Sequence, residues 1–342
     1  MRKRARLIYN PTSGREALAH DLVEILGIFE QAGYETSAYA TTPAPNSAAN
    51  EARRCAKDGF ELIIAAGGDG TINQVVNGLA GLKRRPKMAI IPAGTTNDYA
   101  RALRIPRNDP VAAAKVVLKN QTVNMDIGQA GDQYFINIAA GGLLTELTYD
   151  VPSQLKSIFG YAAYLAKGVE LLPRVKPVEM DLKYDGGHYV GKASMFFLAL
   201  TNSVGGFEQL VPDASLDDGK FTMIIVKTGN LAKMLHLMTL VLNGGKHIND
   251  PSIIYAKTHK VVAKAPKDRL MINLDGEYGG DAPMTFRNLK QHIEMFADTD
   301  RIPDEAITDP EIVDAERHFV SAVDQLPETS TETPLDSQDA EK

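Results

Sequence analysis

Hydrophobic positions in the first 120 residues alternate between two spacings. Short apolar or alternating runs predict strands, and apolar residues three and four positions apart predict helices. The run at 62–66 is wholly apolar, which is typical of a strand buried on both faces. The predicted strands cover 6–10, 35–40, 62–66 and 88–92, and the predicted helices cover 16–33, 48–57, 71–80, 97–103 and 111–119. This alternation predicts an open, mostly parallel α/β sheet.

From about Val123 the pattern changes to strand runs separated by turn residues. Asp132, the Asp-Gly-Gly at 185–187 and the Asp-Asp-Gly at 217–219 are turn signals of this kind. The predicted strands cover 134–139, 178–184, 193–201, 220–227, 253–265 and 271–275, and two predicted helices cover 153–172 and 231–243. We therefore expect a second, antiparallel β-sandwich-like domain.

These patterns set the expected domain boundaries. The α/β domain is predicted at 1–124, with residues 297–318 packing back onto it, and the β-rich domain at 125–296. Residues 324–342 are rich in Pro, Glu, Thr and Ser and are predicted to be a disordered acidic tail.

Composition narrows the class of protein. The chain has 342 residues, of which 44% are hydrophobic and 23% charged, so disorder of the whole chain is excluded. The single cysteine, Cys55, excludes a disulfide scaffold and favours a reducing compartment. The longest apolar run, at 195–200, is far shorter than the roughly 20 residues of a membrane span, and we expect a cytoplasmic protein.

Charge is distributed unevenly along the chain. The net charge is −6, but residues 298–342 alone carry −11, which leaves the rest at +5. A mildly basic body is compatible with an anionic partner. Without a recognisable binding motif, it gives little reason to expect nucleic acid.

Three loops follow predicted strands of the first sheet and lead into predicted helices. We name them the first loop (10–14, Asn-Pro-Thr-Ser-Gly), the second loop (67–73, Gly-Gly-Asp-Gly-Thr-Ile-Asn) and the third loop (93–98, Ala-Gly-Thr-Thr-Asn-Asp). Helix N-termini attract phosphate, and glycine lets the backbone approach it closely. The second loop lacks the last glycine of a dinucleotide fingerprint, and no Walker A loop is present.

Asp69 places a carboxylate within the second loop. A carboxylate inside a phosphate cradle repels phosphate unless it holds a metal ion or manages a proton. Asp98 repeats this feature in the third loop, although a carboxylate there also suits a helix N-terminus.

The Gly-Gly-Asp-Gly-Thr sequence at 67–71 resembles the nucleotide loop shared by diacylglycerol, sphingosine and ceramide kinases, NAD kinases and phosphofructokinases. Four further stretches narrow the resemblance: the first loop, Pro92 with the third loop, the Pro-Asp-Ala-Ser-Leu-Asp-Asp-Gly at 212–219, and the Asp-Gly-Glu at 275–277. In this order they resemble the soluble diacylglycerol kinases of Gram-positive bacteria, from about residue 5 to about residue 310. The resemblance implies a phosphofructokinase- or NAD-kinase-like first domain and a second domain that binds lipid and Mg²⁺.

The resemblance also implies roles for individual residues. Asp218 would bind Mg²⁺ through its carboxylate, and Ser215 and Lys220 through backbone carbonyls. Asp69, with Asp98 and Asp126, would belong to a carboxylate–water–metal network near the phosphates. The implied ATP site comprises Asn10, Pro11, Thr12, Ser13, Gly14, Thr41, Gly67, Gly68, Asp69, Gly70, Thr71, Ile72, Asn73 and Thr95.

Glu277 is the general base that the resemblance favours. Asp275 lies two residues earlier, so on an extended strand the two side chains would share a face, and either could take the proton of the acceptor hydroxyl. The alternative interpretation is that Asp275-Gly276 is only a hairpin turn.

A lipid substrate requires docking on a membrane, and basic residues favour an anionic surface. The candidates are Arg15, Arg101 and the predicted helix 153–172, where Lys167 lies among apolar and aromatic residues. These cations could instead bind ATP phosphates, and the helix could be an ordinary amphipathic helix. We expect peripheral binding at the inner face of the membrane, and the resemblance makes a homodimer the expected assembly.

The leading hypothesis is therefore an Mg²⁺- and ATP-dependent kinase that converts 1,2-diacylglycerol to phosphatidic acid. The alternatives are a related kinase acting on a sphingoid base or phosphatidylglycerol, an NAD kinase, and a catalytically inactive lipid-sensing protein.

Overall fold

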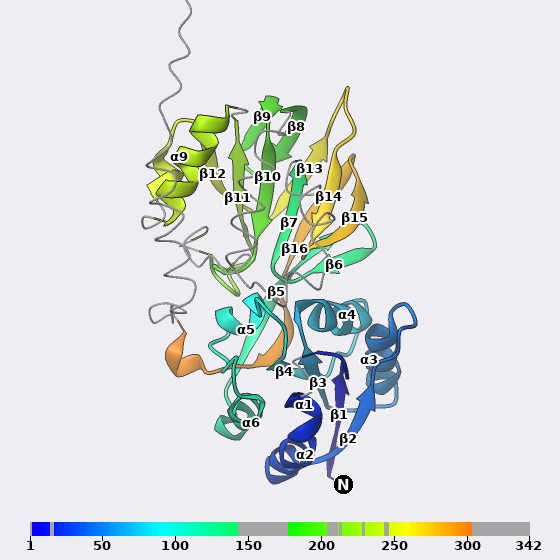
Figure 1. The fold of residues 1–342 in the computed structure, drawn as a ribbon. Helices are drawn as coiled ribbons and strands as arrows, with labels where there is room; N and C mark the ends of the chain where they lie inside the picture. Colours follow the sequence, from blue (N-terminus) through cyan, green and yellow to red (C-terminus); the bar gives the residue numbers. More distant parts are fainter. Residues whose placement is uncertain are drawn as a thin grey trace, which may run out of the picture.

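A computed structural model describes residues 2–13, 17–142, 177–203, 211, 214–227, 230–242 and 246–302. Gly14, Arg15, Lys167, the predicted helix 153–172 and the tail 324–342 lie outside the described residues, as does the segment 303–318 that was expected to pack back. Two sheets of ten and six strands form the framework (Figure 1).

The first part of the chain is the predicted parallel α/β sheet. Its strands run in the order β2-β1-β3-β4, and every neighbouring pair is parallel. The strands are β1 (Lys3–Tyr9), β2 (Tyr34–Ala40), β3 (Leu62–Gly67) and β4 (Lys87–Pro92). The helices are α1 (Ala17–His20), α2 (Leu22–Gln31), α3 (Ser47–Lys57), α4 (Asp69–Leu79), α5 (Asp98–Ala102), α6 (Pro110–Lys115) and the 3₁₀ helix η2 (Val116–Lys119).

The second part is the predicted antiparallel sandwich. Its strands are β5 (Thr122–Ala130), β6 (Gln133–Phe135), β7 (Ile138–Gly142), β8 (Val178–Tyr184), β9 (Gly187–Ala193), β10 (Met195–Ala199), β11 (Phe221–Val226), β12 (Ile253–Thr258), β13 (Lys260–Lys264), β14 (Met271–Leu274), β15 (Glu277–Asp281) and β16 (Met284–Phe296). The helical elements are α9 (Leu231–Leu242), η4 (Lys246–Asn249) and η5 (Thr299–Arg301). The six-stranded sheet runs β12-β11-β10-β7-β14-β15. The predicted fold class is therefore confirmed.

Strand β16 connects the two parts of the chain. It pairs with β4 in parallel at Met295–Met88 and with β5 and β13 in antiparallel fashion, so the parallel strands continue into β13, β8 and β9. The register shifts between Leu289 and Ile293, and Gln291 has a φ of +49°. This irregularity breaks the two-residue alternation, which explains why β16 was not predicted.

Several predicted boundaries were wrong. The predicted helix 16–33 is two helices separated by Asp21, a residue type that favours helix starts over helix interiors. The predicted strand 253–265 is divided at His259 into β12 and β13, which belong to different sheets. The predicted strand 134–139 is interrupted between β6 and β7, and β9 and β15 were missed.

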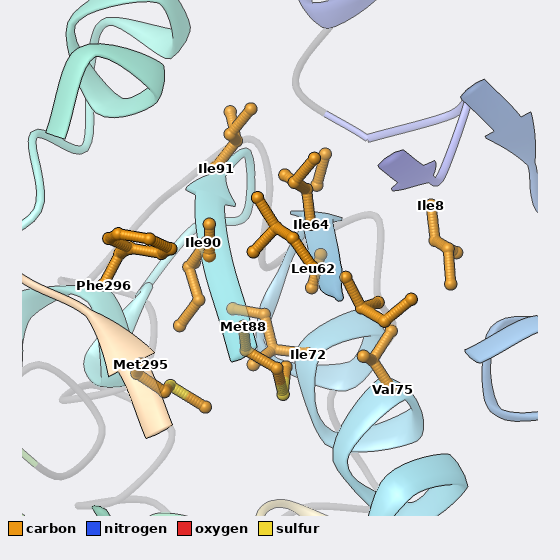
Figure 2. Packing of buried hydrophobic residues seen from close by; sticks show 14 of the residues in the cluster. Ile8, Leu62, Ile64, Ile72, Val75, Met88, Ile90, Ile91, Met295 and Phe296 are labelled. Atoms are coloured by element: carbon orange, nitrogen blue, oxygen red, sulfur yellow. The ribbon is translucent and has the colours of Figure 1, made fainter. Parts of the chain in front are cut away.

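Three hydrophobic clusters stabilise this arrangement. The first lies around the parallel strands, where Met295 and Phe296 of β16 pack beside Met88 and Ile90 (Figure 2). The second lies between the two sheets and holds a group of phenylalanine rings with centroids 5.6 to 6.4 Å apart: Phe135, Phe196, Phe221 and Phe286. The third includes Leu237 of α9.

The domain boundary at 124/125 falls within β5 and remains a prediction. Over the described part of the chain, no helix combines the length and hydropathy that crossing a membrane would require.

Candidate active site

The loops that follow the parallel strands meet at one edge of the sheet. The amide of Asn10 donates to the Ala66 carbonyl at 3.1 Å, the amide of Thr41 donates to the Tyr9 carbonyl at 2.8 Å, and the amide of Ala93 donates to the Gly67 carbonyl at 2.9 Å. The first loop, Thr41, the second loop and the third loop therefore lie side by side, as expected for the carboxyl ends of parallel strands.

The first loop is a compact turn built around Asn10. The Asn10 Oδ1 accepts hydrogen bonds from the Thr12 amide at 3.0 Å and from the Thr12 hydroxyl at 2.8 Å. The Ser13 amide donates to the Asn10 carbonyl at 3.2 Å. Pro11 and Thr12 are exposed, so they can face a ligand at this edge.

The second and third loops touch through glycine. A Cβ on Gly94 would lie 2.6 Å from the Gly68 Cα, and a Cβ on Gly67 would lie 2.6 Å from the Thr71 hydroxyl oxygen. Within the third loop, Asn97 has a φ of +49° and its side chain pairs with the Gly94 amide and carbonyl at 2.8 and 2.9 Å. These close approaches explain why glycine is required at these positions, where the sequence pattern only suggested it.

Asp69 begins α4 and lies beside Asp98 of the third loop. Its Oδ2 accepts from the Thr96 hydroxyl at 2.9 Å, and its Oδ1 accepts from the Tyr99 amide at 3.5 Å. Burial, followed by the negative charge of Asp98, raises the pKa of Asp69 to about 6. Asp98 is buried and accepts from the Ser203 hydroxyl at 2.7 Å. Two carboxylates placed so closely can attract a cation or hold a proton.

Asp126 of β5 holds two segments that are distant in sequence. It is buried, and it accepts from the Gly219 amide at 2.6 Å, from the Gln291 amide at 2.7 Å and from the Asn288 side chain at 3.2 Å. Burial raises the pKa of Asp126, and the charge of Asp218 raises it further, although these three hydrogen bonds act to lower it. Asp126 thereby fixes the 215–220 loop against the irregular part of β16.

The 215–220 loop offers hard oxygen atoms of the kind Mg²⁺ prefers. The Asp218 Oδ1 accepts from the Lys220 amide at 2.8 Å, and the Ser215 hydroxyl donates to Asp217 at 3.3 Å. The charge of Asp218 acts on Asp126, so this loop carries negative charge that a bound cation would offset. Within the described residues, no three acidic, His or Cys side chains gather into a metal site, so ligands here would include backbone carbonyls and water.

Asp275 and Gly276 form the turn between β14 and β15, with φ values of +50° and +93°. Positive φ at both positions defines a two-residue hairpin turn. The expectation that Asp275 and Glu277 share one face of an extended strand was therefore wrong. Glu277 is the exposed first residue of β15 and pairs with Leu274 across the hairpin.

The Asp275 carboxylate is saturated with hydrogen bonds. Its Oδ2 accepts from the Asn73 side chain and the Ile136 amide, both at 2.7 Å, and its Oδ1 accepts from the amides of Asn137 and Ile138 at 2.9 and 2.8 Å. Asn73 was predicted in the ATP site, and its side-chain amide is directed to this turn. The second loop and the Glu277 hairpin are thus joined through the bond between Asn73 and Asp275.

The Tyr99 ring lies close enough to two of these acidic groups for their charges to act on it. It is fully buried at the start of α5. Burial raises its phenolic pKa, and the charges of Asp275 and Asp126 raise it further. Asp69 bonds the Tyr99 amide, so Asp69, Asp126 and Asp275 all lie around one residue.

Arg101 lies one turn along α5 from the third loop and is buried. It lines a cavity of about 270 Å³ together with Arg104, Arg107 and Arg301, and Asp109 is the acidic residue among the described lining groups. Such a cavity suits an anion.

The remaining predicted residues take different places. Ile72 is fully buried in the first hydrophobic cluster, so its backbone alone can face a ligand. Gly70 and Thr95 are exposed at the loop edge. Lys220 is exposed in the 215–220 loop.

Sequence reasoning missed Thr96, Asn77 and Asn288. Asn77 of α4 pairs with the Tyr134 amide and carbonyl at 2.9 and 2.8 Å, as a strand would. The spacing of Asn73 and Asn77, four residues apart on one helix face, was the signal that could have suggested a polar contact. Nothing in the sequence pairs Asn288 with Asp126.

Two family models match the chain. The model described as the diacylglycerol kinase catalytic domain matches residues 4–130, and the model described as the YegS C-terminal NAD kinase beta sandwich-like domain matches residues 148–297. The two matched regions follow the order of the parallel and antiparallel parts.

Curated relatives resemble nearly the whole chain. A diacylglycerol kinase of Bacillus subtilis is 54% identical over 293 residues, which cover 86% of this chain and 96% of that protein. A diacylglycerol kinase of Staphylococcus aureus is 50% identical over 314 residues, which cover 92% and 98%. Among solved structures, a diacylglycerol kinase of Bacillus anthracis superposes with a TM-score of 0.68 at 24% identity, covering 87% and 97%, which shows the shared fold. A second structure from that organism gives a TM-score of 0.74 at 25% identity, covering 87% and 96%.

Proposed function

Because this chain belongs to the diacylglycerol kinase family, we propose that it transfers the terminal phosphoryl group of ATP to the free hydroxyl of 1,2-diacylglycerol. The hydroxyl oxygen forms a bond to the γ-phosphorus, the bond from that phosphorus to the bridging oxygen breaks, and ADP and phosphatidic acid leave. The observation that carries the proposal is the bond between Asn73 and Asp275, which links the loops at the parallel-strand ends to the hairpin of Glu277.

The loops at the strand ends form the proposed ATP site. The second loop leads into α4, whose N-terminal amides and dipole favour phosphate oxygens. The Gly68–Gly94 contact keeps side chains out of the space where backbone would meet the nucleotide. Thr41 and the first loop extend the site along the same edge.

Glu277 is the proposed general base. It is exposed at the first position of β15, where its carboxylate is accessible to a lipid hydroxyl and can take the proton as the phosphoryl group transfers. Asp69 lies on the nucleotide side, where burial and the neighbouring charge of Asp98 raise its pKa and a nearby cation would stabilise its carboxylate.

Mg²⁺ is part of the proposal, with Asp218 and the backbone carbonyls of Ser215 and Lys220 as its ligands. The ion would neutralise acidic groups of this region, which phosphoryl transfer requires. The chain itself sets the loop, since Asp126 holds Gly219 and Gln291 in place.

Contact with an anionic membrane surface belongs to the same proposal. Basic residues favour an anionic surface, and the arginines at the cavity near α5 are the described candidates for that contact. Peripheral binding at the inner face of the membrane follows from a lipid substrate, and a homodimer remains a prediction from the family resemblance alone.

An acceptor panel tests the proposed reaction. Transfer of labelled phosphate from Mg²⁺-ATP is measured in mixed micelles with 1,2-diacylglycerol, a sphingoid base or phosphatidylglycerol, and in solution with NAD. We expect diacylglycerol to be the preferred acceptor. Preference for another acceptor, or no transfer to any lipid while ATP still binds, would contradict the proposal.

Two variants test the assigned roles in the same assay. Glu277→Gln should lower kcat at least about 100-fold, the usual range for loss of a general base. Asp69→Ala should abolish transfer while the fold survives. The matched control is Glu179→Gln on β8, where the carboxylate pairs with Lys267, and we expect it to keep the wild-type rate.

A further inference from the structure

The turn at Asp275 and Gly276 makes contacts with two distant parts of the chain. The carboxylate accepts from three successive backbone amides, those of Ile136, Asn137 and Ile138, at the junction of β6 and β7. The Asp275 amide in turn donates to the Ile138 carbonyl at 2.9 Å. The fourth donor, the Asn73 side chain, comes from α4.

This arrangement leaves the Asp275 carboxylate little capacity for a substrate. A carboxylate offers about four acceptor sites, and the four donors at 2.7 to 2.9 Å use that number. To accept the proton of a hydroxyl, Asp275 would have to give up a charge-assisted hydrogen bond. Glu277, exposed two residues later, presents its carboxylate to solvent and is the better placed base.

The same contacts determine where Glu277 lies. Asp275 and Gly276 are held at positive φ, and the Gly276 amide donates to the Asn273 side chain at 2.8 Å. Glu277 follows directly and starts β15. Through Asn73, one helical turn after Asp69, the hairpin is tied to the helix that begins in the second loop; Figure 1 shows α4 beneath β6.

We propose that Asp275 is a positioning residue that, through Asn73, fixes the Glu277 hairpin relative to the nucleotide loops. This inference rests on the proposed function, in which Glu277 is the base. The reacting groups must be held in register for phosphoryl transfer, and a misplacement of about 1 Å can cost about 100-fold in rate. Asp275 sets the position of the hairpin relative to the nucleotide loops without touching the substrate.

A charge-swap experiment tests this role. Asp275→Asn places an amide against the Asn73 and Ile136 donors, and Asn73→Asp places a second carboxylate against Asp275. Each single variant should lower kcat for diacylglycerol by about 100-fold. In the double variant the amide group of the Asn side chain at position 275 can donate to the carboxylate introduced at position 73 while its oxygen keeps the Asn137 and Ile138 amides, and the Ile136 amide alone stays without its acceptor, so at least about tenfold of kcat should return.

The pH profile separates positioning from direct catalysis. Asp275→Asn should keep the acidic limb of the kcat/KM profile, because the substitution leaves the Glu277 carboxylate in place, and the KM for ATP should change less than about threefold. Loss of that limb in Asp275→Asn, or a double variant no faster than the singles, would overturn the proposal.

A second hairpin turn provides the matched control. Asp185 and Gly186 join β8 and β9, and the Asp185 carboxylate accepts from the His259 amide at 2.6 Å and the Thr258 hydroxyl at 2.9 Å. This turn is an Asp-Gly hairpin of the same length outside the candidate active site. Asp185→Asn should leave kcat within about twofold of wild type.

Amide hydrogen exchange keeps the proposal independent of the lipid assay. Peptides covering 136–138 and 275–279 should lose protection in both single variants and regain it in the double variant. If the wild-type protein phosphorylates no lipid, the proposed function fails, and this exchange pattern alone decides whether Asp275 and Asn73 set the hairpin. Unchanged protection in the singles would show that they do not.

Discussion

Acidic side chains at two places in this molecule are held in opposite ways. At the ends of the parallel strands, Asp69 lies against Asp98, and its Tyr99 contact is long at 3.5 Å. Elsewhere, Asp126 and Asp275 accept three and four hydrogen bonds, five of the seven from backbone amides. Carboxylates that accept three or four hydrogen bonds organise the backbone around them, whereas Asp69, with one short hydrogen bond from Thr96 and Asp98 beside it, remains available to a cation or a proton.

The comparison changes how the acidic motif residues are interpreted. Asp69 and Asp275 both occur in Asp-Gly sequences and both lie close to Tyr99. Their chemistry differs because different donors surround them. Asp69 is thus the candidate for cation or proton chemistry, and Asp275 the candidate for positioning.

Replacing Asp126 should produce the largest change in stability. Asp126→Ala leaves the amides of Gly219 and Gln291 and the Asn288 side chain without their acceptor. These three hydrogen bonds are part-buried, and a hydrogen bond to a carboxylate contributes about 1 to 3 kcal/mol, so we expect the free energy of unfolding to fall by about 3 to 4 kcal/mol in a urea titration. Added Mg²⁺ should stabilise the variant less than the wild type.

The control for this prediction lies in the same loop. Asp217 is exposed and accepts from the Ser215 hydroxyl at 3.3 Å. Asp217→Ala should change the free energy of unfolding by less than about 1 kcal/mol. Equal losses in the two variants would show that donor saturation is not what distinguishes Asp126.

Replacing Asp69 should raise the free energy of unfolding at neutral pH, whereas replacing Asp126 should lower it. The folded pKa of about 6 lies above the ordinary value of 3.8, so the folded state binds more protons between these values and loses stability as pH rises through them. Asp69→Asn removes this loss. Without Mg²⁺, the variant should be more stable than wild type at pH 8 by about 2 to 3 kcal/mol. This difference in the free energy of unfolding should be smaller at pH 4.

Urea titrations from pH 4 to pH 8 measure this difference. A wild-type curve that runs parallel to the Asp69→Asn curve would mean that Asp69 is not destabilised by burial and by Asp98. The variant should lack kinase activity at every pH. The same substitution would then raise stability and remove function.

A smaller loss of stability is expected at the uncharged contact between the second and third loops. Gly94→Ala puts a Cβ 2.6 Å from the Gly68 Cα, a backbone contact that cannot rotate away. We expect a loss of about 2 kcal/mol in the free energy of unfolding and a raised KM for ATP, because the second and third loops must separate.

Gly70→Ala is the matched control for Gly94→Ala. No described atom lies within 4 Å of a Cβ built on Gly70, which is helical within α4. This variant should keep or gain up to about 1 kcal/mol of stability, because alanine favours helix more than glycine does. Similar losses in the two variants would contradict the steric explanation.

Much of the fold followed from patterns within short windows of sequence. The alternation of strands and helices to residue 119, the glycine loops at the strand ends and the antiparallel second part were all predicted. Strand and helix periods and the steric demands of glycine are local properties, so a few neighbouring residues suffice to express them.

Contacts between distant segments could not be obtained in that way. The sequence suggested that Asp275 could act as a base, but the amides that saturate it lie more than 130 residues away, at 136–138. β16 reached the parallel sheet only because the chain returned to it at Met88, and β13 separated from β12 at His259. Local chemistry determined which residues could accept hydrogen bonds or bind a cation; the path of the folded chain decided which donors met each carboxylate, and therefore what each one can do.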